Sequence, residues 1–241
     1  MQGDREHQHP SRAVVSPTVA RYIFVSDYVR TRFGFSEVPI LTIYPGSDLA
    51  LFTRSHGSAP PDNCVGMAYR PEADKLDERA IEVFITLARC RPGIRALIIG
   101  GGRFLDEYRR RVERASVANA VEFTGYVAYD RLPAFYRRLS VFVAPVHAES
   151  FGQVTPFAMS MGIPVAGYRM GALGEILGDE SLLAPAGDAE ALADIVIGLL
   201  EDRTRRLEVG ARNRARALEL FSVERMIERY ATVYDEVLET R

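Results

Sequence analysis

The sequence lacks several features that mark common protein classes. It has no tryptophan and two cysteines, Cys64 and Cys90, whose spacing is not that of a metal site. Two such thiols predict reduced, buried cysteines in a cytoplasmic protein; a disulfide between them is an alternative that the fold does not need. No apolar run approaches the roughly 18 residues of a membrane span, and the polar start of the chain does not resemble a signal peptide. We therefore expect no transmembrane segment and a cytoplasmic location.

An excess of one charge is also missing. Thirty basic residues against 32 acidic ones leave a net charge of -2, which argues against nucleic acid or an anionic membrane as a partner. A phosphate group would have to be bound by local features. The chain also has no Ser nucleophile elbow, Cys/His pairing, His-Glu-x-x-His motif or Walker lysine. These absences exclude serine hydrolases, metalloproteases and P-loop NTPases.

What the sequence does contain is an alternation of strand-length apolar runs with helical patterns, which is typical of α/β proteins. We predict a Rossmann-like parallel sheet with helices on both faces. Strands are expected at residues 22–25, 40–44, 63–67, 96–99, 120–123, 141–144, 165–167 and 182–184. Helices are expected at residues 76–90, 105–115, 130–139 and 189–201, the last with Asp188 as its N-cap.

A polar stretch rich in Gly, Ser and Pro at residues 53–62 is expected to be a linker. Residues 1–52, before it, hold two of the expected strands. Residues 63–220, after it, are expected to form one complete Rossmann-like domain. Residues 221–241 form an expected final helix, with Ser222 as N-cap and an apolar stripe of Met226, Tyr230, Val233 and Val237.

The most informative motif follows the apolar run at residues 141–144. Glu149 lies in the loop after this expected strand, and Gly152 and Gln153 open a short helix. Free N–H groups at a helix start bind phosphate oxygens, and a carboxylate accepts hydrogen bonds from sugar hydroxyls. The stretch therefore suits a ligand that carries both phosphate and hydroxyl groups.

Two cations follow the expected strand at residues 63–67. Arg70 and Lys75 lie beyond its carboxyl end, where open parallel sheets bind their ligands. They either clamp a diphosphate or pair on the surface with Glu72, Asp74 or Asp77, and the spacing alone favours neither interpretation.

Two further turns after expected strands are rich in glycine. Residues 100–102 do not complete a dinucleotide fingerprint, because Leu105 replaces the third glycine and no acidic residue closes a second strand. We expect them to allow a tight turn that can border the ligand. Glu175, in the turn at residues 171–175, is expected to be a helix-start acid rather than a catalyst.

In this order, the segments resemble the C-terminal, nucleotide-sugar-binding half of retaining GT-B glycosyltransferases of the family 4 type. The resemblance runs from about Tyr22 to Tyr234. It implies that Arg70 and Lys75 bind the donor's diphosphate. It further implies that Gly152 and Gln153 contact the diphosphate oxygens. Gly125, Tyr126 and Val127 are implied to contact the nucleotide base.

The family's signature consists of two glutamates, and this chain keeps the first. Glu149 matches the glutamate near the donor sugar, so the resemblance implies that Glu149 is the catalytic residue. The second glutamate, which holds the ribose hydroxyls, is replaced by Phe157. A charged hydrogen bond worth roughly 1.5–3 kcal/mol, or about tenfold to hundredfold in affinity, would be missing. No metal or other cofactor is required, because the cations and the helix start neutralise the diphosphate.

The resemblance implies a glycosyltransferase that moves a sugar from a nucleoside diphosphate sugar to an acceptor hydroxyl with retention. The family's acceptor-binding first domain is represented by residues 1–52. An alternative is a non-catalytic or half-enzyme donor-binding module that needs a second polypeptide to supply the N-terminal domain. A nucleotide-sugar epimerase of the same architecture is a third interpretation, but it does not explain Arg70, Lys75 and Glu149 as a set.

Overall fold

The computed structural model describes residues 19–33, 38–54 and 61–239 of the chain. Within them, the main body is a parallel sheet of β3 (Cys64–Ala68), β4 (Arg95–Ile99), β5 (Val121–Gly125), β6 (Val141–Ala144), β7 (Val165–Tyr168) and β8 (Leu183–Ala184). The spatial order is β5-β4-β3-β6-β7-β8. A separate parallel pair joins β1 (Tyr22–Phe24) to β2 (Ile40–Thr42).

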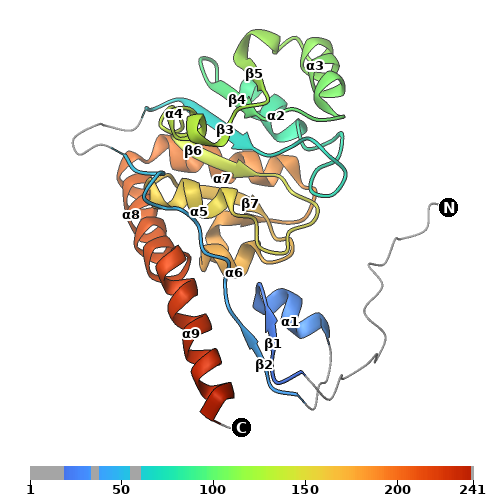
Figure 1. Cartoon of the computed structure of the whole chain (residues 1–241). Coiled ribbons are helices and arrows are strands. Elements are labelled where there is room, and N and C mark those ends of the chain that lie inside the picture. The colour runs from blue at the N-terminus through green and yellow to red at the C-terminus, as the bar shows by residue number, and fades with distance from the viewer. Residues whose placement is uncertain (1–18, 34–37, 55–60, 240–241) are drawn as a thin grey trace, which may run out of the picture.

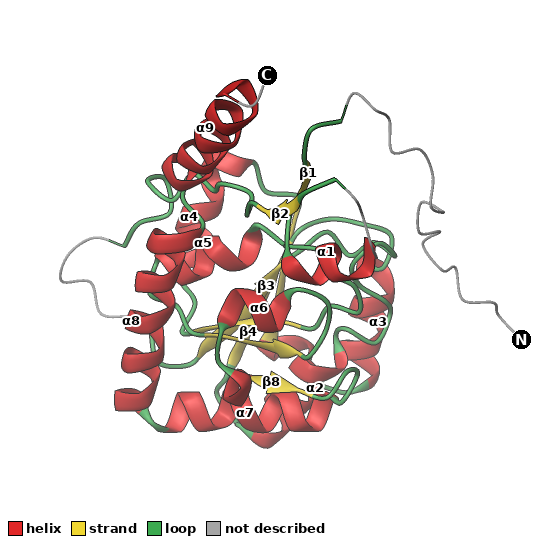
Figure 2. Ribbon diagram, turned by 90° about the horizontal axis from the view of Figure 1, so that it is seen from below, coloured by secondary structure: helices red, strands yellow, loops and turns green. Residues whose placement is uncertain are grey.

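Helices cover both faces of the six-stranded sheet, as the sequence predicts (Figure 1, Figure 2). On one face lie α2 (Glu82–Cys90), α3 (Leu105–Arg114) and α7 (Ala189–Glu201). On the other lie α4 (Leu132–Tyr136), α5 (Val154–Ser160) and α6 (Leu173–Leu177), with α8 (Arg203–Leu220) packed against α5. The chain also contains α1 (Asp27–Phe33), α9 (Val223–Glu239) and the short 3-10 helices η1 (Ala118–Ala120), η2 (Tyr129–Arg131) and η3 (Glu180–Leu182).

The strand order creates a switch point between β3 and β6. From β3 the chain moves outward through β4 to β5, and it then returns to β6 and moves the opposite way through β7 to β8. The loops that follow β3 and β6 therefore lead to helices on opposite faces and diverge. A crevice at the carboxyl ends of the strands is where open α/β sheets bind ligands.

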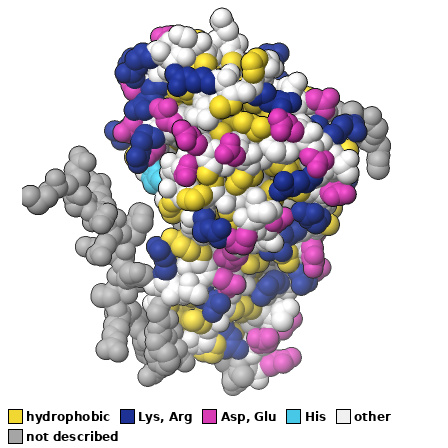
Figure 3. All heavy atoms as spheres, turned by 180° about the vertical axis from the view of Figure 1, so that it is seen from behind, with side chains coloured by type: hydrophobic (Ala, Val, Ile, Leu, Met, Phe, Trp, Pro, Cys, Tyr) yellow, Lys and Arg dark blue, Asp and Glu magenta, His cyan; other side chains and the backbone are white. Residues whose placement is uncertain are grey.

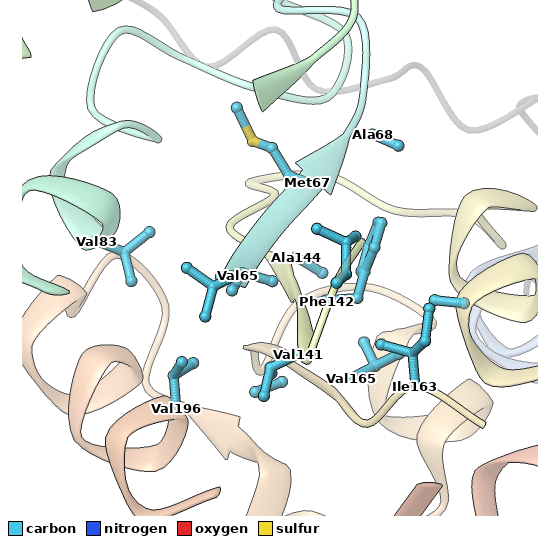
Figure 4. Packing of buried hydrophobic residues seen from close by; sticks show 14 of the residues in the cluster. Val65, Met67, Ala68, Val83, Val141, Phe142, Ala144, Ile163, Val165 and Val196 are labelled. Carbon is cyan, nitrogen blue, oxygen red and sulfur yellow. The ribbon is translucent and has the colours of Figure 1, made fainter. Parts of the chain in front are cut away.

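The core is centred on β3 and β6, which are covered on both faces. Val65, Met67, Val141 and Phe142 have no exposed surface, as expected of central parallel strands. Figure 4 shows side chains of α2 and α7 approaching these strands, with Val83 and Val196 among them. This buried centre gives the loops at the carboxyl ends of β3 and β6 a rigid base.

Two predicted helices are shorter than expected. The helix predicted from residue 76 begins at Glu82, because the Asp77 carboxylate accepts the Arg79 N–H at 2.9 Å and holds a turn there. The Asp77 carbonyl is also engaged, by the Tyr108 hydroxyl at 2.7 Å. The helix predicted at residues 130–139 consists of η2 followed by the shorter α4.

Two α-helices were not predicted. The longer, α8, is rich in arginine and has no regular apolar stripe, yet the Asp202 carboxylate caps its start by accepting the Arg205 N–H at 2.8 Å. The other, α1, is short and owes its position to tertiary contacts. Glu175, the expected helix-start acid, lies in the first turn of α6. The expected N-caps Asp188 and Ser222 are confirmed, because they accept from Ala191 N at 2.9 Å and Arg225 N at 3.1 Å.

The cysteine prediction is half right. Both thiols are free, but Cys64 is half-buried and Cys90 is exposed rather than buried, because Cys90 is the last residue of α2.

No helix among the described residues combines the length and the apolar character needed to cross a membrane. Residues 55–60 of the expected linker lie outside the described residues, so that domain boundary stays a prediction.

Residues before the linker contact the rest of the chain at several places. The Glu175 carboxylate of α6 accepts the N–H groups of Asp27 and Tyr28, at 2.7 and 3.0 Å, at the start of α1. Just before α9, Phe221 is buried with its ring edge-on to Tyr44 at 5.2 Å.

Candidate functional site

A cavity of about 460 Å³ opens at the switch point, at the carboxyl ends of β3, β4, β5 and β6. Its volume is within the range of small-molecule sites. It is lined by Ala68, Tyr69, Arg70, Asp74, Lys75, Ile99, Gly100, Gly101, Tyr126, Val127, Leu132, Glu149, Gly152, Gln153 and Val154. The structure thus brings together most of the residues that the sequence singled out, from four separate loops.

Glu149 is the buried acid of this cavity. Its side chain has no exposed surface, and Oε1 lies 2.5 Å from the Lys75 Nζ. Oε1 also accepts the Phe151 N–H at 3.2 Å. Among the described residues, Oε2 is buried without a hydrogen-bond partner. A buried carboxylate oxygen in this state is costly, and a ligand hydroxyl donating to it would remove that cost.

Two glycines make room for Glu149. Gly152 has a φ of +75°, and a Cβ on it would collide with the Glu149 carboxylate. Gly171 has a φ of +58°, and a Cβ there would collide with the Glu149 carbonyl oxygen, which accepts the Ala172 N–H at 2.8 Å. The position of the carboxylate therefore depends on the missing side chains of both glycines.

The two cations behave differently. Lys75 pairs with Glu149 across the cavity, not with the acidic neighbours that the surface interpretation offered. Arg70 is mostly exposed, and its guanidinium lies 3.5 Å from the Asp74 carboxylate. This is the surface pairing that the sequence offered as an alternative, but both residues also line the cavity. The His147 N–H donates to the Lys75 carbonyl at 3.0 Å and ties the loop after β3 to the loop after β6. Cations and carboxylate thus meet at one end of the cavity.

The start of α5 borders the same end. Gln153 is the N-cap, and the Gly152 carbonyl accepts the Thr155 N–H at 3.1 Å. Gly152 and Gln153 both line the cavity. The helix therefore begins one residue after the predicted pair, with its N–H groups next to Lys75 and Glu149.

The opposite end of the cavity is formed by the loop after β5. Tyr126 is 84% exposed at the cavity mouth, and Val127 lines the wall beside it. Gly125 is not among the lining residues, since its carbonyl accepts the Gly100 N–H at 3.1 Å and joins two loops. Gly100 and Gly101 border the cavity, as the sequence suggested for that turn.

Phe157 lies behind the cavity and does not line it. Its ring stacks on Phe52, with centroids 4.0 Å apart and planes within 4°, and meets the edge of Tyr129 at 5.8 Å. The side chain is 4% exposed. The residue at the position of the second signature glutamate therefore belongs to an aromatic cluster.

Several lining residues were missed by sequence reasoning, among them Tyr69, Leu132 and Val154. Tyr69 is buried, and this burial, followed by the nearby Glu149 carboxylate, raises the pKa of its hydroxyl. The hydroxyl lies 3.5 Å from the Thr155 Oγ1. Leu132 and Val154 are the first residues of α4 and α5. Apolar periodicity assigned such residues to the core, and only their place next to the predicted loops could have drawn attention to them.

No group of three His, Cys, Asp or Glu side chains that could hold a metal ion occurs in the described ranges.

Comparison with known sequences assigns the chain to a family. The sequence pattern of the family described as glycosyl transferases group 1 matches residues 64–202, which is more than half of the chain. The chain belongs to this family. The match covers the six-stranded sheet and the cavity.

Curated relatives of this group 1 chain include two mannosyltransferases. The chain is 29% identical over 223 residues to the lipopolysaccharide core biosynthesis mannosyltransferase LpsB of Rhizobium meliloti, covering 85% of this chain and 63% of that protein. It is 30% identical over 220 residues to the GDP-mannose-dependent alpha-(1-6)-phosphatidylinositol monomannoside mannosyltransferase of Mycobacterium tuberculosis, covering 79% and 55%. The chain thus spans between about half and two thirds of the length of these relatives.

Solved structures show the same fold. HepE of Anabaena in complex with UDP superposes with a TM-score of 0.80 at 22% identity, over 90% of this chain and 64% of that one. The C-terminal domain of the group 1 glycosyl transferase LpcC from Francisella tularensis superposes with a TM-score of 0.66 at 23% identity, over 74% of this chain and all of that one. The fold is that of the C-terminal half of GT-B glycosyltransferases.

Proposed function

We propose that this chain is the donor-binding part of a glycosyltransferase that moves a sugar from a nucleoside diphosphate sugar to an acceptor hydroxyl. The observation that carries the proposal is the meeting of Arg70, Lys75 and Glu149 at one end of a cavity at the switch point of the sheet. This end supplies cations for a diphosphate and a carboxylate for a sugar. The relatives that are named as mannosyltransferases, one of them GDP-mannose-dependent, support this class of reaction.

In this proposal the cations of the cavity bind the diphosphate, and its buried carboxylate binds the sugar. Arg70 and Lys75 neutralise the negative charge that develops on the leaving diphosphate as the bond to the sugar breaks. The N–H groups of Gly152 and Gln153 bind its oxygens at the start of α5. Glu149, held by Lys75 and the Phe151 N–H, orients the sugar by accepting a hydrogen bond from a sugar hydroxyl at Oε2. With these groups in place, the diphosphate is neutralised without a metal ion.

The proposal also covers the residues that contact the nucleotide base and the stereochemistry of the transfer. The loop at Gly125, Tyr126 and Val127 contacts the nucleotide base, with Gly125 acting by holding the loop to Gly100. The reaction proceeds with retention at the sugar carbon, which rests on the resemblance to the retaining family 4 type. Proton NMR of the first product formed reads the anomer directly, and an inverted linkage would contradict retention.

The first prediction tests the diphosphate site. In titration calorimetry with UDP, GDP and ADP, the variant Arg70→Ala/Lys75→Ala should bind the preferred nucleotide at least about a hundredfold more weakly than the wild type, because two charge-assisted hydrogen bonds are lost. The matched control is Arg109→Ala/Arg225→Ala, which removes two exposed cations that each pair with an acid three residues away. Equal binding by the test and control variants, or no binding of any nucleotide to the wild type, would refute the proposal.

An alternative is favoured by one observation, the aromatic stack that Phe157 forms at the position of the second signature glutamate. In this alternative, the chain binds the donor but transfers sugar only when a second polypeptide supplies an acceptor-binding domain. Transfer by the purified chain would exclude this alternative, whereas transfer that appears only on mixing with such a polypeptide would support it.

A further inference from the structure

The acids of the cavity are all at its diphosphate end. Its two lining carboxylates are Asp74 and Glu149. Glu149 is bonded to Lys75 at 2.5 Å, and Asp74 lies 3.5 Å from Arg70. If the cations bind the diphosphate, both carboxylates are committed to the phosphate and sugar end of the donor.

The wall that joins this end to the base end is apolar. Leu132 opens α4, six residues after Tyr126, and Val154 opens α5 directly after Gln153. The Tyr136 hydroxyl of α4 donates to the Val154 carbonyl at 3.1 Å and keeps the two helices together. A ribose between the base loop and the cations therefore lies against the side chains of Leu132 and Val154, neither of which can accept a hydrogen bond from a hydroxyl.

Phe157 extends this apolar character behind the wall. It lies three residues after Val154, so the two side chains share one face of α5. Its ring is stacked on Phe52 and almost fully buried. The position of the second signature glutamate therefore supplies no hydrogen-bond acceptor to the cavity, because its side chain belongs to an aromatic cluster.

We propose that this donor pocket does not recognise the 2′-hydroxyl of the ribose, so that it accepts deoxyribonucleoside diphosphate sugars as readily as ribonucleoside ones. The inference rests on the proposed function and concerns its substrate class. A pocket that holds ribose through a carboxylate binds a deoxyribonucleotide about tenfold to a hundredfold more weakly, because the hydroxyl is lost and the acceptor is left partly unpaired. An apolar wall has no acceptor to leave unpaired.

The test compares matched nucleotide pairs on the wild-type chain. Dissociation constants for UDP and dUDP, GDP and dGDP, and ADP and dADP are measured by titration calorimetry in one buffer. For whichever base binds, the ribo and deoxy forms should differ by less than about fivefold. A larger preference for the ribo form overturns the inference while leaving the donor site intact. If neither form of any base binds, the proposed function itself fails.

A pair of variants tests the place of the ribose. Val154→Glu puts a carboxylate on the half-buried wall, and it should bind the ribo form about tenfold or more better than the deoxy form. Val154→Leu keeps the wall apolar and should show no preference. A Val154→Glu variant that binds both forms equally would overturn the placement of the ribose against this wall.

Discussion

At the scale of single residues, Glu149 is the one acidic side chain that is buried among the described residues. It is a buried carboxylate with one oxygen bonded to Lys75 and the other without a partner. An acid of this kind is retained in a fold when a ligand completes its hydrogen bonds or when it holds a neighbouring group in place. In our proposal Glu149 does both, because it positions Lys75 for the diphosphate and offers Oε2 to the sugar.

The second prediction follows from these two tasks. Glu149→Gln keeps the shape of the side chain but removes its charge, so the extra affinity of a nucleoside diphosphate sugar over the bare nucleoside diphosphate should fall about tenfold or more. Binding of the bare nucleotide should change little, since Lys75 is released to the diphosphate. Asp74→Asn, the same change at the other lining carboxylate, serves as the control. Calorimetry with both ligands gives the two ratios, and an unchanged ratio in Glu149→Gln would show that Glu149 does not contact the sugar.

The third prediction concerns Gly152. Gly152→Ala puts a Cβ at a φ of +75° and into the Glu149 carboxylate, whereas Gly187→Ala puts one at a φ of +76° into open space. Both variants should lose roughly 1–2 kcal/mol of unfolding free energy from the left-handed backbone. Only Gly152→Ala should also lose binding of the nucleotide sugar, because it displaces the carboxylate. Thermal unfolding and calorimetry on the two proteins separate these effects, and identical behaviour would contradict the role assigned to Gly152.

At the scale of elements, α6 connects the sheet to the N-terminal residues. The Glu175 carboxylate accepts two N–H groups at the start of α1, while the α8 side chain of Arg216 donates to the carbonyls of Glu175 and Ile176 at 2.8 and 2.9 Å. A carboxylate at a helix start is favoured by the free N–H groups there. Glu175 lies in the first turn of α6, as the sequence predicted, and its carboxylate also binds the start of a second helix, α1.

The fourth prediction tests this connection. In Glu175→Ala, the Asp27 and Tyr28 amides should exchange with solvent about tenfold faster or more, because their acceptor is lost. Glu190→Ala removes an exposed acid from the first turn of α7 and should leave these amides unchanged. Hydrogen exchange read by NMR checks both variants. Equal protection of the two amides in both proteins would mean that other contacts hold α1.

The fifth prediction concerns the pH dependence of the same region. A hydrogen bond from Thr42, followed by Arg30, holds the pKa of Asp27 below its ordinary value of 3.8. Since the folded pKa is lowered, this carboxylate stabilises the fold above pH 3.8, and the stabilisation is lost as the pH falls through the lowered value. Thr42→Val should move the pKa of Asp27 upward in an NMR titration. A pKa that stays in place would assign the shift to Arg30 instead.

Sequence and structure agree best where an element has a strong local signal. The buried strands, the Asp188 cap and the convergence of Arg70, Lys75 and Glu149 follow from apolar runs, cap residues and the geometry of parallel sheets. What could not be predicted depends on contacts between distant residues. The Phe52–Phe157 stack joins positions 105 residues apart, and the polar helix α8 is held by its packing against α5 rather than by its own pattern.

At the scale of the whole molecule, charge does not guide the ligand to its site. Basic and acidic side chains are interspersed over the face seen in Figure 3, and the net charge is -2. A diphosphate is therefore attracted by the cations of the cavity and not by a field that extends over the surface. We expect binding to depend on Arg70 and Lys75 far more than on the other cations of the chain.

The most direct test of this account is a crystal structure of the chain with the nucleoside diphosphate that it binds most tightly. We predict that the diphosphate lies between the Arg70 guanidinium, the Lys75 Nζ and the N–H groups at the start of α5, with the base beside Tyr126 and Val127. A nucleotide bound outside this cavity, or bound in it with the diphosphate away from Arg70 and Lys75, would contradict the central claim.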